Sequence, residues 1–425
     1  MSDLEECVES LHKFESEHAF GNLNMMLSAD RIISRYSLEY GIRMLACIRS
    51  FWDHILNNVT IDAILGEIAC ATEWMAWSLA QRRDIPYLLP YPSPAANLFF
   101  FLDGPTASWR SMQEQFEVAR TRALSPEAAK TAEEFVRRFR QQKAKAPFLA
   151  WAQHSPLAPR FRELARRVAR VPFRIQTYLE DGRFEVGSYH GTPPWQPIFQ
   201  DTVRIIRHVA SEAAIFDRKI ASGPKVYFPL HVQPEFTTDV RAPFCTNQIA
   251  LAENISKSLP IGYRLAVKEH PGMKGERKLN YYHELKKLRN VQLLSPSVDS
   301  HDLIQQSDAV VTITGSSAWE AILYEKPVIS FGPLCYGFYD LVYPCDSIAG
   351  LPAVLSKALR RFRPDHDLLL KFVWSFLESA HHLEWADPIR SPAIVAAPNI
   401  QKIAAAIVSE VSSRAASRLP DHVAV

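Results

Sequence analysis

The chain has 425 residues, of which 47% are hydrophobic and 22% charged, and its formal net charge is +2. This length predicts two or three domains of about 150 residues each, with enough apolar side chains to form cores. A net charge so close to zero gives no support to a general nucleic-acid-binding role. The six cysteines include no CxxC pair. This spacing indicates neither a zinc site nor a disulfide framework, and we expect reduced thiols in a cytosolic protein.

The N-terminal residues Met1-Ser-Asp-Leu-Glu-Glu lack the basic and then apolar layout of a signal peptide. No stretch approaches the roughly 18 uninterrupted apolar residues that a membrane-spanning helix needs. The sequence therefore predicts a cytoplasmic protein, whose association with a membrane would be peripheral.

The first half of the chain begins with helical apolar spacing over residues 31–58. A short buried-strand pattern follows at 61–65 and ends at Gly66-Glu67. Helical spacing over about 69–82 leads to a second strand-like run at 85–89. Strand, helix and strand in this order predict a βαβ unit.

Residues 106–220 are predicted to be helical, and Ser125-Pro-Glu127 is a typical helix start with a capping serine. Basic residues are concentrated between 137 and 174. Such a run is commonly a solvated helix face. The alternative is a docking face for an anionic acceptor or for the inner membrane surface.

From Gly223 onward, strand-like runs alternate with helical stretches, which predicts a parallel, doubly wound sheet. The predicted strands are 225–230, 263–267, 291–294, 309–313 and 327–331. A last helix at 400–411 is expected to cross back onto the first domain. The predicted organisation is an N-terminal α/β domain with a helical basic segment (1–221), a C-terminal α/β domain (222–395), and a crossing helix with a tail (396–425).

Two motifs follow predicted strands at points where a parallel sheet binds ligands. The first, Lys268-Glu-His-Pro271, places an imidazole in a loop that proline stiffens. His270 can donate N–H to a phosphate oxygen, and as an imidazolium it would add charge attraction. The alternative is a loop histidine without a ligand.

The second motif is Thr314-Gly315-Ser316-Ser317, a small turn that opens a helix. Its backbone N–H groups and hydroxyls suit a phosphate, although an ordinary helix cap would use the same residues. Glu320 lies one turn into that helix, where a carboxylate suits ribose hydroxyls. The alternative for Glu320 is a surface acid near a helix N-terminus.

A third polar loop, Phe228-Pro-Leu-His-Val-Gln-Pro-Glu235, ends the first strand of the second domain. Two prolines constrain it, and it presents His231, Gln233 and Glu235. It is either a wall of the ligand site or a proline-stiffened crossover.

A reaction that transfers a group to a hydroxyl needs a carboxylate or histidine to deprotonate that hydroxyl. Glu67 is a candidate because it follows a predicted buried strand, and a solvent-exposed turn acid is the alternative. Asp181, in Glu180-Asp-Gly182, is a rival candidate. No His cluster or Asp-x-Asp pair has metal-ligand placement, so we expect a metal-independent site.

These motifs, together with Lys326-Pro-Val-Ile-Ser-Phe-Gly332, resemble those of the bacterial capsule and surface-polysaccharide synthesis family, which includes Kdo transferases of capsule linkers. The resemblance covers about residues 223–410. It implies an α/β fold of the GT-B type, with two Rossmann-like domains facing a cleft and a helical segment between them. The donor nucleotide would then bind the C-terminal domain and the acceptor largely the N-terminal one.

The His-Pro and Ser-Ser pairs are also similar to donor-phosphate motifs of bacterial sialyltransferases and polysialyltransferases, which use CMP-sugars. That similarity implies that His270, Ser316 and Ser317 contact the CMP phosphate. It further implies that an acidic-Gly motif, matched here by Asp181, supplies the base.

The leading functional hypothesis is a glycosyltransferase of capsule or surface polysaccharide synthesis, with Kdo from CMP-Kdo as one donor. The nucleotide sugar is its substrate, a saccharide or a lipid-linked saccharide is its acceptor, and no cofactor is needed. The alternatives are a sugar-nucleotide epimerase or hydrolase of related fold, and a non-catalytic partner in capsule assembly or export.

Overall fold

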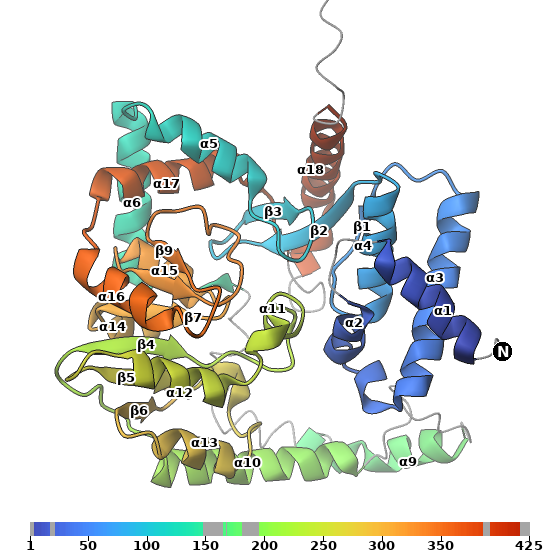
Figure 1. The fold of residues 1–425 in the computed structure, drawn as a ribbon, viewed down its shortest axis with the longest axis horizontal. Coiled ribbons are helices and arrows are strands. Elements are labelled where there is room, and N and C mark those ends of the chain that lie inside the picture. Colours follow the sequence, from blue (N-terminus) through green and yellow to red (C-terminus); the bar gives the residue numbers. More distant parts are fainter. Residues whose placement is uncertain are drawn as a thin grey trace, which may run out of the picture.

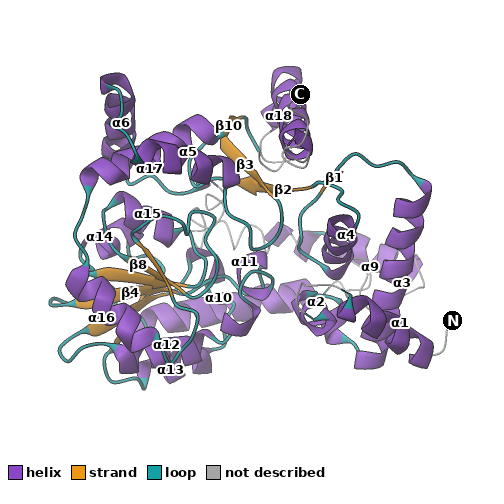
Figure 2. Ribbon diagram, turned by 45° about the horizontal axis from the view of Figure 1, so that its top comes forward, coloured by secondary structure: helices purple, strands orange, loops and turns teal. Residues whose placement is uncertain are grey.

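The computed structural model describes residues 4–17, 22–147, 165–166, 168–180, 195–385 and 392–416. It contains a six-stranded sheet formed by the C-terminal half and a four-stranded sheet formed mainly by the N-terminal half (Figure 1). Helices surround both sheets (Figure 2). The predicted α/β class is therefore confirmed.

The six-stranded sheet is parallel throughout and has the order β6-β5-β4-β7-β8-β9. This is the doubly wound order, in which the direction of winding reverses between β4 and β7. The strands are β4 (Lys225–Pro229), β5 (Arg264–Lys268), β6 (Val291–Leu294), β7 (Ala309–Thr312), β8 (Val328–Ser330) and β9 (Val342–Pro344). The five predicted strands are confirmed, while β9 was not predicted. The switch point between β4 and β7 is where such a sheet is expected to bind a ligand.

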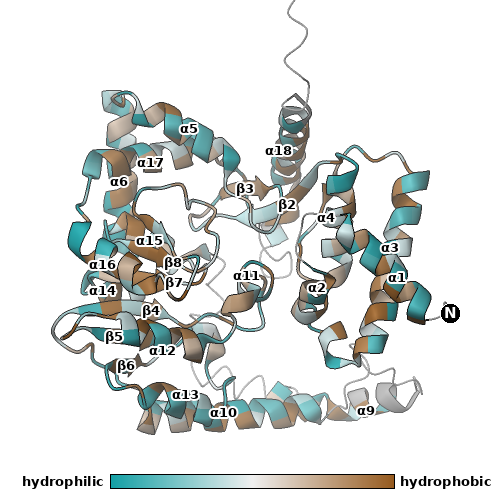
Figure 3. Ribbon diagram, viewed as in Figure 1, coloured by the Kyte–Doolittle hydropathy of each residue, from teal (hydrophilic) through white to brown (hydrophobic). Residues whose placement is uncertain are grey.

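Helices between these strands and after β9 cover both faces of the sheet, so the strands read as continuous apolar runs. They are α12 (Gln248–Ser258), α13 (Leu279–Lys286), α14 (Ser300–Gln305), α15 (Ser317–Leu323) and α16 (Leu351–Arg361). All seven residues of α15 are buried, and this helix is among the most hydrophobic parts of the chain (Figure 3). The start of α15 is thereby fixed against the core.

The N-terminal half begins with α1 (Leu4–Ser16), α2 (Leu23–Ala29) and α3 (Leu38–Asn58). The predicted βαβ unit is confirmed, because β1 (Ile64–Leu65) pairs in parallel with β2 (Tyr87–Pro92) across α4 (Ala71–Arg82).

The rest of the N-terminal sheet departs from the Rossmann-like pattern that we expected. β3 (Leu98–Leu102) is antiparallel to β2, since the connection 93–97 is too short for a parallel crossover. β10 (His381–His382) pairs with β3, also antiparallel.

Two N-terminal helices, α5 (Arg110–Arg120) and α6 (Pro126–Gln142), pack against α17 (His366–Ser379). The predicted helix start at Ser125 is confirmed, because its hydroxyl oxygen accepts a hydrogen bond of 3.2 Å from the Ala128 N–H.

A cluster of aromatic rings joins the start of α5 and the helix α17 to α15. Its members include Trp109, Trp319, Phe372 and Phe376.

The predicted tail helix is confirmed as α18 (Ala397–Ala416), and it crosses back onto the N-terminal sheet. Ala406 packs with Phe99 and Phe101, and the Arg414 Nε lies 2.5 Å from an Asp103 carboxylate oxygen. The return to the N-terminal half nevertheless begins with α17 and β10, earlier in the chain than the boundary expected at residue 396.

Basic side chains between residues 137 and 145 have acidic partners within the chain, which favours the solvated-face interpretation for this part of the basic segment. The pairs are Arg137–Glu134, Arg138–Glu134, Arg140–Glu325, Lys143–Asp302 and Lys145–Asp299. Residues 148–164 and 167 lie outside the described part. The basic segment ends within α9 (Val171–Glu180), and the long helix α10 (Gln196–Ala214) comes after residues 181–194, which also lie outside the described part. Within the described residues, no helix is long and apolar enough to cross a membrane.

Candidate active site

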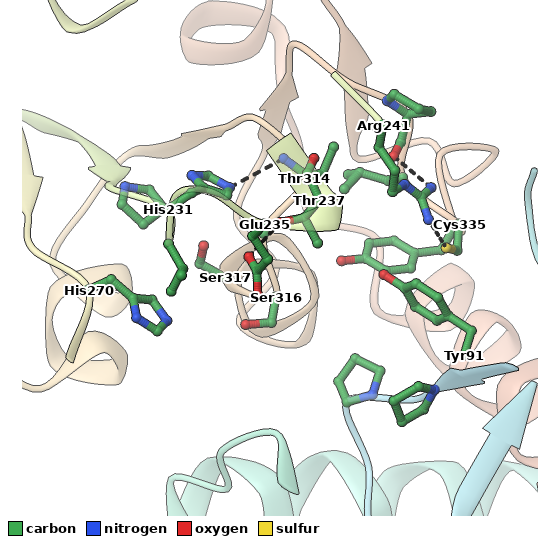
Figure 4. A pocket seen from close by; sticks show the side chains of 18 of the residues that line it. Tyr91, His231, Glu235, Thr237, Arg241, His270, Thr314, Ser316, Ser317 and Cys335 are labelled. Atoms are coloured by element: carbon green, nitrogen blue, oxygen red, sulfur yellow. Dashed lines mark hydrogen bonds between the residues drawn. The ribbon is translucent and has the colours of Figure 1, made fainter. Parts of the chain in front are cut away.

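A cavity of about 330 Å³ lies at the carboxyl ends of β4 and β7, at the switch point of the sheet (Figure 4). Both halves of the chain line it. Tyr91 and Pro92 come from the end of β2, Pro94 follows that strand and Trp109 precedes α5, while the remaining walls are C-terminal. Seven predicted site residues line this cavity, namely His231, Glu235, His270, Thr314, Gly315, Ser316 and Ser317. The expectation that His231, His270 and Ser316 gather at one edge of the sheet is confirmed.

His231 is buried and holds the turn that follows β7. Its Nε2 accepts hydrogen bonds from the Thr314 N–H at 3.3 Å and from the Thr312 hydroxyl at 3.2 Å. Burial lowers the pKa of His231 to about 4, so the imidazole is neutral at pH 7. A β-carbon on Gly315 would lie only 2.8 Å from this Nε2, which explains the glycine. His231 therefore positions the turn that contains Gly315.

His270 is fixed as one tautomer, because the Gly272 N–H donates to its Nδ1 at 3.0 Å. The proton of the neutral ring must therefore sit on Nε2. Burial, reinforced by the nearby Lys268, lowers the pKa of His270 to about 3. The expected imidazolium is thus not favoured in the free protein, and His270 presents a neutral N–H donor to the cavity.

A second cavity, of about 350 Å³, adjoins the first and shares His270, Ser316 and Ser317 with it. Pro271, Lys268 and Glu320 line this second cavity.

Glu320 is 5% exposed, and its Oε2 has no hydrogen-bond partner among the described residues. Burial raises the pKa of Glu320 to about 7, against the opposing effect of Lys268 and Lys145. Burial also lowers the pKa of Lys268 to about 8. A buried acceptor without a partner suits a ligand that donates hydroxyl hydrogens.

Glu269 was not predicted as a site residue, yet it anchors the His270 loop. It is fully buried, it forms an ion pair with Arg277 at 3.0 Å, and it accepts a hydrogen bond of 2.8 Å from the Tyr282 hydroxyl. Its other carboxylate oxygen accepts from the His270 N–H at 2.6 Å. Arg277 lies outside the motif, so no local sequence pattern indicates this network.

Glu235 begins the short helix α11 (Phe236–Asp239) and is the one carboxylate among the described residues that line the first cavity. Its Oε2 accepts a hydrogen bond of 2.6 Å from the Thr237 hydroxyl. Burial raises the pKa of Glu235, with Thr237 and Arg31 opposing that rise. Gln233 has a different role, because its side-chain oxygen accepts from Gln248 at 3.1 Å and it lines neither cavity.

Neither predicted catalytic acid is among the described residues that line these cavities. Glu67 is exposed just beyond β1, its backbone carbonyl accepts a hydrogen bond from the Tyr87 hydroxyl, and it lines neither cavity. Asp181 lies outside the described residues. In the described part of the chain, no group of histidine, cysteine or acidic residues has the arrangement of a metal site.

Residues 229–344, which include both cavity motifs, match the family model described as "Capsule polysaccharide biosynthesis protein". The match covers 116 of the 425 residues and lies within the C-terminal half. The resemblance inferred from its motifs is thereby confirmed. A curated relative, Protein FixF of Sinorhizobium fredii, is 30% identical over 161 residues, and the match spans 36% of this chain and 37% of the length of FixF.

Two solved structures have distantly similar folds. One is described as KpsC of Thermosulfurimonas dismutans, a β-Kdo 2,4-transferase (TM-score 0.40, 13% identity, 74% of this chain and 78% of that chain). The other is a UDP-GlcNAc 2-epimerase from Methanocaldococcus jannaschii (TM-score 0.28, 14% identity, 40% of this chain and 50% of that chain). Similarities this distant identify no activity.

Proposed function

We propose that this protein is a glycosyltransferase of capsule or surface polysaccharide synthesis that takes its sugar from a nucleotide donor. The observation that supports this best is the pair of adjoining cavities that share His270, Ser316 and Ser317. A nucleotide sugar has the same layout, with a phosphate between a nucleoside and a sugar. The match of residues 229–344 to the capsule polysaccharide biosynthesis family model supports the same function.

In this proposal, the phosphate lies at the shared wall and accepts a hydrogen bond from the Nε2–H of His270. The nucleoside occupies the second cavity, where Glu320 accepts hydrogen bonds from ribose hydroxyls. The sugar occupies the first cavity beside Glu235. Kdo from CMP-Kdo remains the proposed donor, and a saccharide or lipid-linked saccharide the proposed acceptor. Nucleotide sugars are made in the cytoplasm, so we propose that location, including the cytoplasmic face of the inner membrane.

Transfer breaks the bond between the sugar and the phosphate oxygen and forms a bond to an acceptor hydroxyl oxygen. A general base must take the proton of that hydroxyl. Neither cavity histidine offers a free basic nitrogen, because His231 Nε2 and His270 Nδ1 already accept backbone N–H groups. Glu235 is therefore the base that we propose, ahead of Glu67 and Asp181.

One assay distinguishes the proposed glycosyltransferase from the two alternative functions. An epimerase or hydrolase would consume the donor without an acceptor, and a non-catalytic assembly partner would consume none. Purified protein is incubated with CMP-Kdo, CMP-N-acetylneuraminic acid, UDP-glucose and UDP-N-acetylglucosamine, with and without a capsule-type acceptor. We expect nucleotide release that depends on the acceptor. Release that is equal without acceptor would favour the hydrolase, and C2 inversion of UDP-N-acetylglucosamine would favour the epimerase.

Activity is expected to survive EDTA, because the proposed contacts to phosphate are N–H and hydroxyl groups. The measurement is acceptor-dependent nucleotide release before and after chelation and gel filtration. Loss of activity that added Mg²⁺ or Mn²⁺ restores would show that a metal takes part.

Donor affinity is expected to decrease by up to about tenfold when the pH falls from about 7.5 to about 6. Glu320, with a pKa of about 7, becomes protonated over this range and accepts ribose hydrogen bonds less well. His270, with a pKa of about 3, does not titrate there. Isothermal titration with a nucleotide sugar measures the change. The same pH dependence in Glu320→Gln would show that another group causes it.

A further inference from the structure

Arg241 is a buried cation without a counter-ion among the described residues. Its side chain lines the first cavity, and the residue is 4% exposed. One guanidinium nitrogen donates to Cys335 Sγ at 3.2 Å and another donates to the Pro333 carbonyl at 2.9 Å. The third nitrogen, Nε, is buried and has no partner in the described part of the chain. The guanidinium carbon also lies 5.5 Å from the centre of the Tyr91 ring.

These contacts compensate a buried charge poorly. A thiol, a carbonyl and an aromatic face are neutral or weak partners, and a buried charge usually has an ionic partner. Tyr91 does not supply negative charge, because burial raises the pKa of its phenol. The chain retains a costly, unpaired guanidinium at the wall of a cavity, as expected where the ligand itself brings the anion.

The position of Arg241 indicates which part of the ligand carries that anion. In Figure 4, Arg241, Tyr91 and Cys335 lie at one end of the cavity and His270 lies at the other, with Glu235 and Ser316 between them. His270 and the serines already offer donors to a phosphate. The guanidinium is therefore placed for a group on a sugar, and its planar fork of donors matches a carboxylate.

We propose that Arg241 binds the carboxylate of an acidic sugar in the first cavity. This inference rests on the proposed function, since it assigns the charge of a sugar substrate in the same site. The carboxylate belongs either to the donor sugar or to the sugar at the acceptor end. Both sources present the same group to the guanidinium.

The test compares ligands that carry a sugar carboxylate with ligands that lack one. The donor arm measures the affinities of CMP-Kdo against CMP and of UDP-glucuronic acid against UDP-glucose. The acceptor arm measures trigalacturonic acid against its carboxyl-reduced form and needs no nucleotide. The proteins are wild type, Arg241→Gln and Arg241→Lys. Arg241→Lys keeps the charge and removes the fork.

In one of the two arms, Arg241→Gln is expected to weaken the acidic ligand by about 10- to 100-fold. Arg241→Lys should lose less of its affinity for the acidic ligand. Both variants should bind CMP and UDP as tightly as the wild type does. An acidic ligand should also raise the melting temperature of the wild type more than its neutral counterpart does, which requires no variant. The inference would be overturned if the wild-type protein bound acidic and neutral ligands with equal affinity in both arms. An equal loss for CMP and CMP-Kdo in Arg241→Gln would also overturn it.

The two proposals fail in different ways. A protein that binds trigalacturonic acid through Arg241 but no nucleotide would contradict the glycosyltransferase and keep the carboxylate site. A protein that transfers sugar with no preference for carboxylates would support the glycosyltransferase and contradict the carboxylate site.

Discussion

Replacing Glu235 with glutamine is expected to lower the rate of sugar transfer by about 10²–10⁴-fold, the usual contribution of a positioned general base. Glutamine keeps the shape of the side chain and an oxygen that can accept the Thr237 hydroxyl, so the fold and donor affinity should change little. Burial raises the pKa of Glu235, which brings its basicity closer to that needed near neutral pH. The measurement is single-turnover transfer together with donor affinity.

Glu67→Gln and Asp181→Asn are the matched controls, since each also replaces a carboxylate by its amide. Glu67 lines neither cavity, so Glu67→Gln is expected to keep nearly full activity. A loss in Asp181→Asn with an active Glu235→Gln protein would assign the base to the acidic-Gly motif. A loss in Glu67→Gln alone would assign it to the end of β1.

Replacing His270 with alanine is expected to weaken donor binding by about 10- to 100-fold, because a hydrogen bond to a charged phosphate is lost. The folded state should tolerate the change, since the Glu269 network holds the loop through the backbone N–H of residue 270. Titration with the nucleotide sugar gives the affinity, and thermal unfolding checks the fold.

His283→Ala provides the control for His270→Ala, because His283 lies exposed on α13 and lines neither cavity. His270→Gln, which can retain a donor, should recover part of the affinity. Wild-type affinity and turnover in a folded His270→Ala protein would remove this residue from the site.

The sequence predicted the C-terminal sheet well, because strands buried on both faces are continuous apolar runs and helices separate them. It missed β9, whose three residues at the edge of the sheet include a proline and form no clear pattern. It also assigned α17 to the C-terminal domain. Amphipathic spacing shows that a helix buries one face, but not which helices it packs against.

The sequence predicted those residues of the candidate site that directly follow the ends of strands. His270 and Ser316 are examples, because parallel strands bring their carboxyl ends to one edge. Arg241 and Tyr91 meet only through the packing of the two halves, and neither lies in a recognisable motif. The protonation states of His231 and His270 also depend on burial, which the sequence does not show.

The central claim is that a nucleotide sugar binds across the wall that the two cavities share. The most direct test is a crystal structure of the protein soaked separately with CMP and with UDP. The account predicts that one nucleotide binds with a phosphate oxygen within about 3.2 Å of His270 Nε2 and with its ribose hydroxyls at Glu320. A nucleotide bound elsewhere, with both cavities left to solvent, would contradict it.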